Sequence, residues 1–375
     1  MTASTLPPGL LPEGLHDLLP PMAEAEAALC TELMAVFAAH GHERVSPPLV
    51  EYEESLGSRL ASSARRELLR FTDPVSQHTL ALRSDITGQV GRIAVTRMAA
   101  SPRPLRLSYA GPVLRVRGTQ LAPERQSLQI GAELIGLDNA AAAQAMLTLA
   151  VDALGAAGAA GLSLDLTLPT LVAELHAAGL PAGSASLTQL QALLDGKDAA
   201  SLRAAGAGAY EPLIAAAGPA PRALDILRTL PVAPAKLDAL AGVVESLASL
   251  PVTVTLDPTE RHGFEYQSWL GFSFFASGLP FEIGRGGSYS LLHPDGRQEA
   301  ALGFSLYLDS LVSAGLGRQD PSRVFLPLGT AAADGAALRA RGFATVAALC
   351  PACTPAGCTH IFENGVARPR SKDQD

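Results

Sequence analysis

The residues best suited to bind a ligand lie on one predicted strand, Leu128 to Ile135. Its side chains alternate, so Gln129, Gly131 and Glu133 share one face, while apolar side chains fill the other. The amide and the carboxylate offer directional hydrogen-bonding groups, and the glycine between them leaves room for a ligand. Arg115, on the preceding predicted strand, brings a rigid guanidinium to the same face. This set suits a small zwitterion; the alternative is a solvated outer face of a sheet with scattered polar residues.

Length and composition narrow the class of protein. The chain has 375 residues, enough for about two or three domains, and 48% of them are apolar. No long uninterrupted apolar run predicts a membrane span, and no basic patch precedes an apolar stretch at the start, as in a secretory signal. The expected location is therefore the cytoplasm. A formal net charge of −8 provides no basic footprint for nucleic acid.

Three of the four cysteines cluster near the end of the chain, at Cys350, Cys353 and Cys358, with His360 close by. Three thiols and an imidazole are a donor set that suits tetrahedral zinc. The usual zinc spacing has two well-separated pairs, however, and this cluster is more compressed. We therefore expect loop cysteines that stay reduced, and no metal site. Cys30 lies alone in an apolar helical segment and is expected in the core.

Helices and strands are mixed along the chain, in an order that differs from a regular β-α-β alternation. Apolar spacing predicts helices over Met22–His40, Ile86–Met98 and Asn139–Ala157. Strands are predicted over Glu43–Val50, Phe71–Leu82, Leu105–Val116, Val252–Leu256, Phe264–Phe275, Leu279–Ile283 and Ala301–Leu306. Gly284-Arg285-Gly286-Gly287 is glycine-rich, but it does not open a helix in a βαβ unit, so it is neither a P-loop nor a dinucleotide fingerprint.

The composition divides the chain into a core, an insertion and a tail. From about residue 169 to 250, alanine, leucine and proline dominate and strand signals disappear, which predicts an all-helical insertion. The tail is predicted to run strand, helix (Ala331–Arg341), strand (Ala344–Leu349). We therefore expect a core domain at residues 1–320, interrupted by the insertion, and a small α/β appendage at 321–375.

Five short motifs, in the right order, carry a resemblance to a known family over about residues 8–312. The chain resembles the catalytic module of histidyl-tRNA synthetase, a class II synthetase, and more closely the synthetase-like regulatory subunits of ATP phosphoribosyltransferase. Each motif is modest alone, but the set is specific. They are Gly41-His-Glu-Arg-Val-Ser-Pro-Pro-Leu-Val-Glu51, Arg83-Ser-Asp-Ile-Thr87, Leu114-Arg115 with Arg125-Gln-Ser-Leu-Gln-Ile-Gly-Ala-Glu133, His262-Gly-Phe-Glu-Tyr-Gln267 and Gly286-Gly-Ser-Tyr289.

The resemblance implies a class II α/β fold, with a mixed, mostly antiparallel sheet and flanking helices, and a pocket for free L-histidine. Carboxylates suit the ligand's ammonium, amides and phenols suit its ring nitrogens, and arginine suits its carboxylate. Alternatives remain open: Asp85 is also suited to cap the helix near Ile86, and the tyrosines to lie at the edge of a core. The implied ligand-binding residues are Asp85, Thr87, Arg115, Arg125, Gln129, Glu133, Tyr266, Gln267 and Tyr289.

Three departures from the synthetase pattern concern ATP. In the second motif, Arg117 stands where the family usually has a glutamate; in the third, Ser310 stands where an arginine stacks on adenine. His262 occupies the position of the catalytic arginine of the histidine-specific loop. Neither serine nor a neutral imidazole replaces a guanidinium that neutralises phosphate charge. The residues after 313 are also too few for an anticodon-binding domain.

Retained ligand residues beside lost ATP and tRNA machinery are typical of a sensor. The resemblance implies a regulatory subunit without catalysis or cofactor, which activates an ATP phosphoribosyltransferase catalytic subunit and senses histidine for feedback. It also implies a homodimer through the segment from Val45 to Glu51. The alternatives are a divergent or truncated histidyl-tRNA synthetase, and a histidine-binding protein with another partner.

Overall fold

The chain folds into two units, Met1–Gly317 and Arg318–Asp375, which are described separately. The structure, a computed structural model, describes residues 7, 9–57, 68–118, 123–261, 267–319 and 322–370. Within these residues, no helix has the length and apolar character needed to cross a bilayer.

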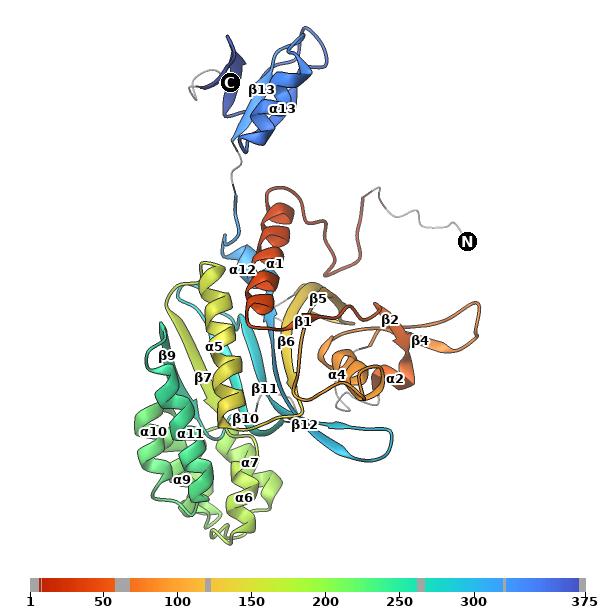
Figure 1. Cartoon of the computed structure of the whole chain (residues 1–375). Coiled ribbons are helices and arrows are strands. Elements are labelled where there is room, and N and C mark those ends of the chain that lie inside the picture. Colours follow the sequence, from red (N-terminus) through yellow and green to blue (C-terminus); the bar gives the residue numbers. More distant parts are fainter. Residues whose placement is uncertain are drawn as a thin grey trace. The chain divides into compact units, whose positions relative to one another are not determined.

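A large mixed sheet forms the centre of the first unit (Figure 1). Among the described residues it has nine strands, in the order β1-β5-β6-β12-β11-β10-β7-β9-β8. The pairs β1–β5 and β7–β9 are parallel and the other neighbours antiparallel, which confirms the predicted mixed, mostly antiparallel sheet. The bounds are β1 Glu43–Arg44, β5 Leu105–Leu114, β6 Gln126–Ile135, β7 Leu162–Thr167, β8 Gly218–Pro219, β9 Val252–Asp257, β10 Gln267–Phe275, β11 Gly284–Leu292 and β12 Gln298–Tyr307.

One face of this sheet is apolar because alternate side chains of its strands point to it. On β6 these are Ile130, Ala132 and Leu134, which belong to the main hydrophobic core. Helices α1 (Met22–Ala39), α5 (Ala140–Ala156) and α12 (Leu308–Ser313) pack here; α1 and α5 lie on the same side of the sheet in Figure 1. Phe37 of α1 meets Phe304 of β12 edge to face, at 5.7 Å between ring centroids.

The opposite face carries the polar side chains and is covered in part by helix α4 (Thr87–Thr96). Ile86 and Val90 join Tyr109 of β5 and Tyr289 of β11 in a second, smaller core. A separate small sheet lies near α4 in sequence, with the order β2-β4-β3. Its bounds, with those of the helix that follows β2, are β2 Val50–Tyr52, α2 Glu53–Gly57, β3 Arg70–Thr72 and β4 Thr79–Leu82.

The segment between β7 and β9 is a block of short helices, as predicted, apart from the two residues of β8 that join the sheet edge. Lys197, between α7 and α8, ties this block to the end of β9. Its Nζ donates to both carboxylate oxygens of Asp257, at 2.7 and 2.5 Å, and to Thr259 Oγ1 at 2.5 Å. The helices are α6 Leu171–Ala177, α7 Leu187–Asp195, α8 Ala199–Ala204, the 3-10 turn η1 Gly208–Tyr210, α9 Glu211–Ala216, α10 Ala220–Leu227 and α11 Pro234–Leu247.

In its described residues, the second unit is a small sheet in the order β14-β13-β15-β16 with one helix. The predicted strand, helix, strand is present as β13 (Arg323–Leu326), α13 (Ala332–Ala340) and β14 (Ala344–Ala347). The hairpin β15 (His360–Glu363) and β16 (Val366–Pro369) was not predicted. Leu338 of α13 packs on Val324 and Leu326.

Three strand predictions in the first unit are wrong. Of Glu43–Val50, only Glu43–Arg44 (β1) and Val50, the first residue of β2, lie in strands. Leu279–Ile283 is a connection, and the strand that follows, β11, begins at Gly284 and runs through the glycine-rich segment. Glycine disfavours strands in isolation, but here neighbouring side chains need the space that it leaves. Phe71–Leu82 is a hairpin of two short strands joined by a turn at Asp73, whose carboxylate accepts hydrogen bonds from the backbone of Val75 and Ser76.

Candidate functional site

An open pocket lies on the polar face of the large sheet, where β6, β12 and β11 meet the start of α4. Its cavity volume is about 30 Å³. Carboxylates, hydroxyls and glycines alternate along its walls. The pocket is lined by Asp85, Thr87, Glu133, Arg285, Gly286, Gly287, Tyr289, Gly303, Phe304, Ser305 and Tyr307.

Glu133 is the buried acid of this pocket, with a fully buried side chain on β6. Tyr289 donates to its Oε2 at 2.8 Å, and Tyr109 donates to its Oε1 at 3.2 Å. Burial raises the pKa of Glu133 to about 8, and the nearby Asp85 adds to the rise, while the hydroxyl hydrogen bonds oppose it. The site therefore holds an acid that is ready to ionise when a cationic group or a ring N–H arrives.

Gln129 connects β6 to the start of α4. Its Nε2 donates to Asp85 Oδ2 at 2.8 Å and to Ser305 Oγ at 2.7 Å, and its Oε1 accepts from the Ile86 backbone N–H at 2.9 Å. Ile86 is the N-cap residue of α4 and has no side-chain cap. The alternative role of Asp85 as a helix cap is therefore wrong: its half-buried carboxylate lines the pocket instead.

Tyr109 is a site residue that the sequence did not indicate. It lies opposite Gly131 in the β5–β6 register, and a Cβ added at Gly131 would stand 2.5 Å from its hydroxyl. The room that Gly131 leaves is thus taken by this tyrosine and not by a ligand. Its hydroxyl also bonds to Thr87 Oγ1 at 3.0 Å and to Ser305 Oγ at 2.9 Å. In the sequence, Tyr109 falls on the same face of its predicted strand as Leu107, and this does not distinguish a site residue from a core residue.

Ser305 and Gly303 of β12 complete the floor, and neither was predicted as a site residue. They lie opposite Gly131 and Glu133 in the β12–β6 register. A Cβ at Gly303 would meet Glu133 Oε2 at 1.6 Å, so only glycine lets the carboxyl group occupy its place. The site therefore needs matched residues on two strands that are far apart in the sequence.

Of the predicted site residues, the structure brings five together: Asp85, Thr87, Gln129, Glu133 and Tyr289. Tyr266 lies outside the described residues. Gln267 is described by its backbone alone, as the first residue of β10, opposite Tyr289 in the register.

The structure does not bring Arg115 and Arg125 into the pocket. Arg115 follows the end of β5 and is not among the lining residues, although its charge acts on Tyr307 and Asp309. Arg125 instead holds backbone: its Nε donates to the Arg115 carbonyl at 3.1 Å and its Nη1 to the Glu13 carbonyl at 3.2 Å. Strand alternation predicts Arg115 on the Gln129 face, whereas Arg125 is implied by the resemblance alone. Both lie just beyond the regular strands, and neither is among the residues that line the pocket.

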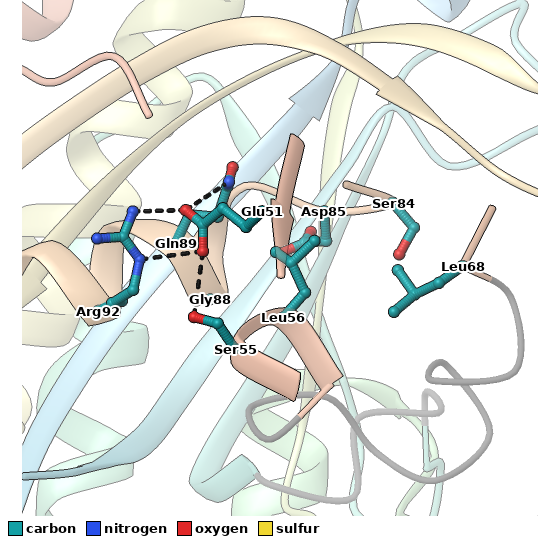
Figure 2. A pocket seen from close by; sticks show the side chains of 9 residues that line it. All are labelled: Glu51, Ser55, Leu56, Leu68, Ser84, Asp85, Gly88, Gln89 and Arg92. Atoms are coloured by element: carbon teal, nitrogen blue, oxygen red, sulfur yellow. Dashed lines mark hydrogen bonds and ion pairs between the residues drawn. The ribbon is translucent and has the colours of Figure 1, made fainter. Parts of the chain in front are cut away.

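A second hollow adjoins the first through Asp85 (Figure 2). Figure 2 shows Glu51 bonded to Arg92, Gln89 and Ser55, so most polar groups of this hollow already have partners within the protein. Glu51 is the last residue of the motif that resembles the class II dimer segment. The cluster braces α4 against β2, and through α4 it supports the Asp85 wall of the pocket.

Near β11, the charged and phenolic side chains of the pocket already interact with other groups of the protein. Arg285 makes a two-point ion pair with Glu282, and the ring of Tyr307 lies in the fields of Arg285 and Arg115. Burial raises the pKa of Tyr307 to about 12. Ser310 is half-buried on α12, and Arg117 is exposed beyond β5. His262 lies outside the described residues.

Over the described ranges, no three histidine, cysteine or acidic side chains converge as a metal-binding group. The sulfurs of Cys350 and Cys353 lie 2.7 Å apart, whereas Cys358 is buried and His360 Nδ1 bonds to Thr359 Oγ1 at 2.9 Å.

Comparison with known structures finds this fold among synthetases. A protein from Bacillus halodurans described as an ATP phosphoribosyltransferase regulatory subunit/histidyl-tRNA synthetase superposes with a TM-score of 0.77 at 22% identity, covering 90% of this chain and 92% of that one. Histidyl-tRNA synthetase of a Nostoc species gives 0.72 at 16% identity, covering 91% of this chain and 85% of that one. These likenesses confirm the predicted class II synthetase-like fold.

Sequence comparison gives the family. Residues 14–311 match the family model for histidyl-tRNA synthetase. The ATP phosphoribosyltransferase regulatory subunit of Paramagnetospirillum magneticum is 48% identical over 366 residues, which cover 94% of this chain and 95% of that protein. The protein of the same name from Rhodospirillum rubrum is 41% identical, covering 97% of this chain and 98% of that protein. The chain therefore belongs to the family of ATP phosphoribosyltransferase regulatory subunits, which share the fold of histidyl-tRNA synthetase.

Proposed function

We propose that this chain is the non-catalytic regulatory subunit of an ATP phosphoribosyltransferase. In this role it activates a short catalytic subunit at the first step of histidine biosynthesis and senses L-histidine for feedback. The observation that carries the proposal is the match over nearly the whole length of relatives with that name, combined with an intact polar pocket. The cytoplasm, where amino acids are made, is the proposed location.

The pocket supports histidine as its ligand because its groups divide into two sets. Asp85 and Thr87 are half-exposed lining residues, where a carboxylate and a hydroxyl suit an ammonium. The buried Gln129 amide holds the Asp85 carboxylate in place. Glu133 and Tyr289 lie deeper, where an acid and a phenol suit the two ring nitrogens of an imidazole. No pair in this set has the geometry of a nucleophile and its base, so the described groups are equipped to bind and not to react.

The proposed absence of catalysis is supported by the residues at the positions that contact ATP in synthetases of this class. Ser310 and Arg117 replace the arginine and the glutamate that synthetases of this class present to ATP. Arg285, a cation near the pocket, is already paired with Glu282. A pocket that binds histidine but does not clamp ATP has no means to activate the carboxylate.

Two measurements on the purified chain test this proposal. Calorimetry should show L-histidine binding with a dissociation constant in the micromolar range, about 8 kcal/mol of binding free energy. Exchange of radiolabelled pyrophosphate into ATP should stay at background with histidine present. Robust exchange would instead identify a divergent synthetase, and no binding of histidine would remove the sensor role.

The partner is tested by co-expression with the short catalytic subunit from the same genome. We expect the two chains to co-purify, and phosphoribosyl transfer to ATP to rise strongly when this chain is added and to fall with histidine. Independent migration of the chains, with activity unchanged by mixing, would favour a histidine-binding protein with some other partner.

A further inference from the structure

The second unit contains a pair of cysteines that the proposed function does not use. Its first three elements, β13, α13 and β14, form a parallel βαβ unit, and the chain turns back after β14 through Cys350-Pro-Ala-Cys353. A two-residue spacing between cysteines next to a βαβ unit is a pattern seen in redox-active dithiols. The turn lies wholly within the second unit, at the end of its edge strand β14.

The turn brings the two sulfurs together. The Cys353 N–H donates to the Cys350 carbonyl at 3.1 Å, which closes the turn. The Cys350 N–H donates to Cys353 Sγ at 3.1 Å, and the two Sγ atoms lie 2.7 Å apart. Backbone and side-chain bonds thus fix both thiols in one arrangement, with Cys350 exposed and Cys353 half-exposed.

The other two cysteines differ in every respect that matters for this chemistry. Cys358 is 7% exposed, and Cys30 packs against the main core. The imidazole that a zinc site would need is engaged elsewhere: the ring of His360 packs edge to face on Phe343 and bonds to Thr359. Two sulfurs in contact, with no third metal-binding side chain converging on them among the described residues, suit a covalent bond between the sulfurs better than a metal.

We propose that Cys350 and Cys353 form a reversible dithiol–disulfide site that reacts with low-molecular-weight disulfides. The Cys353 thiolate attacks one sulfur of the small disulfide, whose sulfur–sulfur bond breaks, and the first small thiolate leaves and takes up a proton. Cys350, after losing its proton to solvent, attacks Cys353 Sγ in the mixed disulfide and releases the second small thiol. Two protein thiols are oxidised and one small disulfide is reduced to two thiols.

The hydrogen bonds assign the two roles. The bond from the Cys350 thiol lowers the pKa of Cys353, and the same contact raises the pKa of Cys350. Cys353 is therefore the thiol that ionises first and attacks, and Cys350 is the thiol that resolves the mixed disulfide.

The test equilibrates the full-length chain with oxidised and reduced glutathione, quenches with acid, unfolds, alkylates free thiols and maps peptides by mass spectrometry. We expect Cys350 and Cys353 to escape alkylation together, in one peptide lighter by two hydrogen atoms, while Cys30 and Cys358 are alkylated. Oxidation from about a tenth to about nine tenths should take roughly an 80-fold change in the ratio of oxidised glutathione to the square of reduced glutathione. In Cys353→Ser, Cys350 should be alkylated; in the control, Cys358→Ser, the pair should behave as in the wild type.

Three results would overturn the proposal. Full alkylation of both thiols at every glutathione ratio would show that the turn is inert. A disulfide that includes Cys358 would show that the contact between Cys350 and Cys353 is not the reactive one. About one zinc per chain, released together with restored alkylation by a chelator, would make the pair part of a metal site.

Discussion

At the scale of single residues, Gln129 joins ligand recognition to the local fold. Its amide bonds Asp85, Ser305 and the Ile86 backbone at once, so shortening it affects two properties. The loss of a hydrogen bond near a charged ligand group costs about 1.5–3 kcal/mol, and the orphaned Ile86 N–H reduces stability as well.

Gln129→Ala should therefore weaken histidine binding by about tenfold to about a hundredfold, and lower the free energy of unfolding by about 1–3 kcal/mol. Calorimetry and urea unfolding measure the two effects. The matched control is Gln89→Ala, because Gln89 is equally buried on α4 but bonds Pro48 and Glu51 outside the pocket. Equal loss of affinity in the two variants would show that the effect comes from stability alone.

Glu133 makes stability depend on pH in a direction that can be derived. Its pKa rises from 4.5 to about 8 on folding, so the folded chain holds a proton that the unfolded chain has released between these values. This contribution is complete below about pH 4.5 and is lost as the pH rises towards about 8.

Glu133→Gln removes the titration but keeps the shape of the side chain. Without histidine, the wild type should lose stability relative to this variant as the pH rises from about 5 to about 8. The difference between their unfolding free energies at each pH isolates Glu133 from other titrating groups, such as the buried His42. A difference that does not change with pH would show that Glu133 is already ionised in the free protein.

Among the strands, β12 leaves room at Gly303 for the Glu133 side chain of β6. Gly303→Ala would drive a methyl group into the Glu133 carboxyl group, so we expect loss of histidine binding and about 1–3 kcal/mol of destabilisation from overpacking. The control is Gly155→Ala in α5, where nothing lies within 4 Å of the added carbon. There the helix should gain about 0.5–1 kcal/mol and binding should not change. Unimpaired binding in Gly303→Ala would contradict the position of Glu133.

Lys197 holds the helical block to the end of β9 through its ion pair with Asp257. Lys197→Met leaves the Asp257 carboxylate, 15% exposed, without its ammonium, and should lower the free energy of unfolding by about 1–3 kcal/mol. Lys236→Met is the control, because its partner Glu174 is 47% exposed and water can replace the lysine, so the loss should stay below about 1 kcal/mol. Thermal or urea unfolding compares the two, and equal losses would show that the contact with β9 has no special weight.

For the molecule as a whole, we expect assembly through one edge of the large sheet. β1 is an edge strand of the large sheet, and the segment after it, through Pro47 and Pro48 to Glu51, resembles the class II dimer motif. An edge of this kind is suited to a symmetric contact in which one patch meets itself. We therefore expect a homodimer by light scattering at micromolar concentration, and a larger assembly when the catalytic subunit is added. A monomer under these conditions would show that the motif is kept without its interface.

Alternation along each strand is enough to predict which of its faces is polar. Alternation has a period of two residues and depends only on the chain direction, so Gln129 and Glu133 share a face whatever lies beside them. The helix Asn139–Ala157 was recognised for the same reason, because its apolar spacing is local, and Asn139 indeed caps it through Ala142 N at 2.9 Å. The five motifs, in their order along the chain, indicate the family from the sequence alone.

The side chains that contact those faces depend on how the strands pair in the folded protein. Tyr109 fills the space beside Gly131, and Gly303 admits Glu133, because strands distant in sequence are paired in one register. Arg125 turns to the carbonyls of Glu13 and Arg115 instead of the pocket, since loop residues obey no alternation. Such contacts depend on non-local neighbours, and a pattern read along one strand contains no information about the strand that will lie beside it.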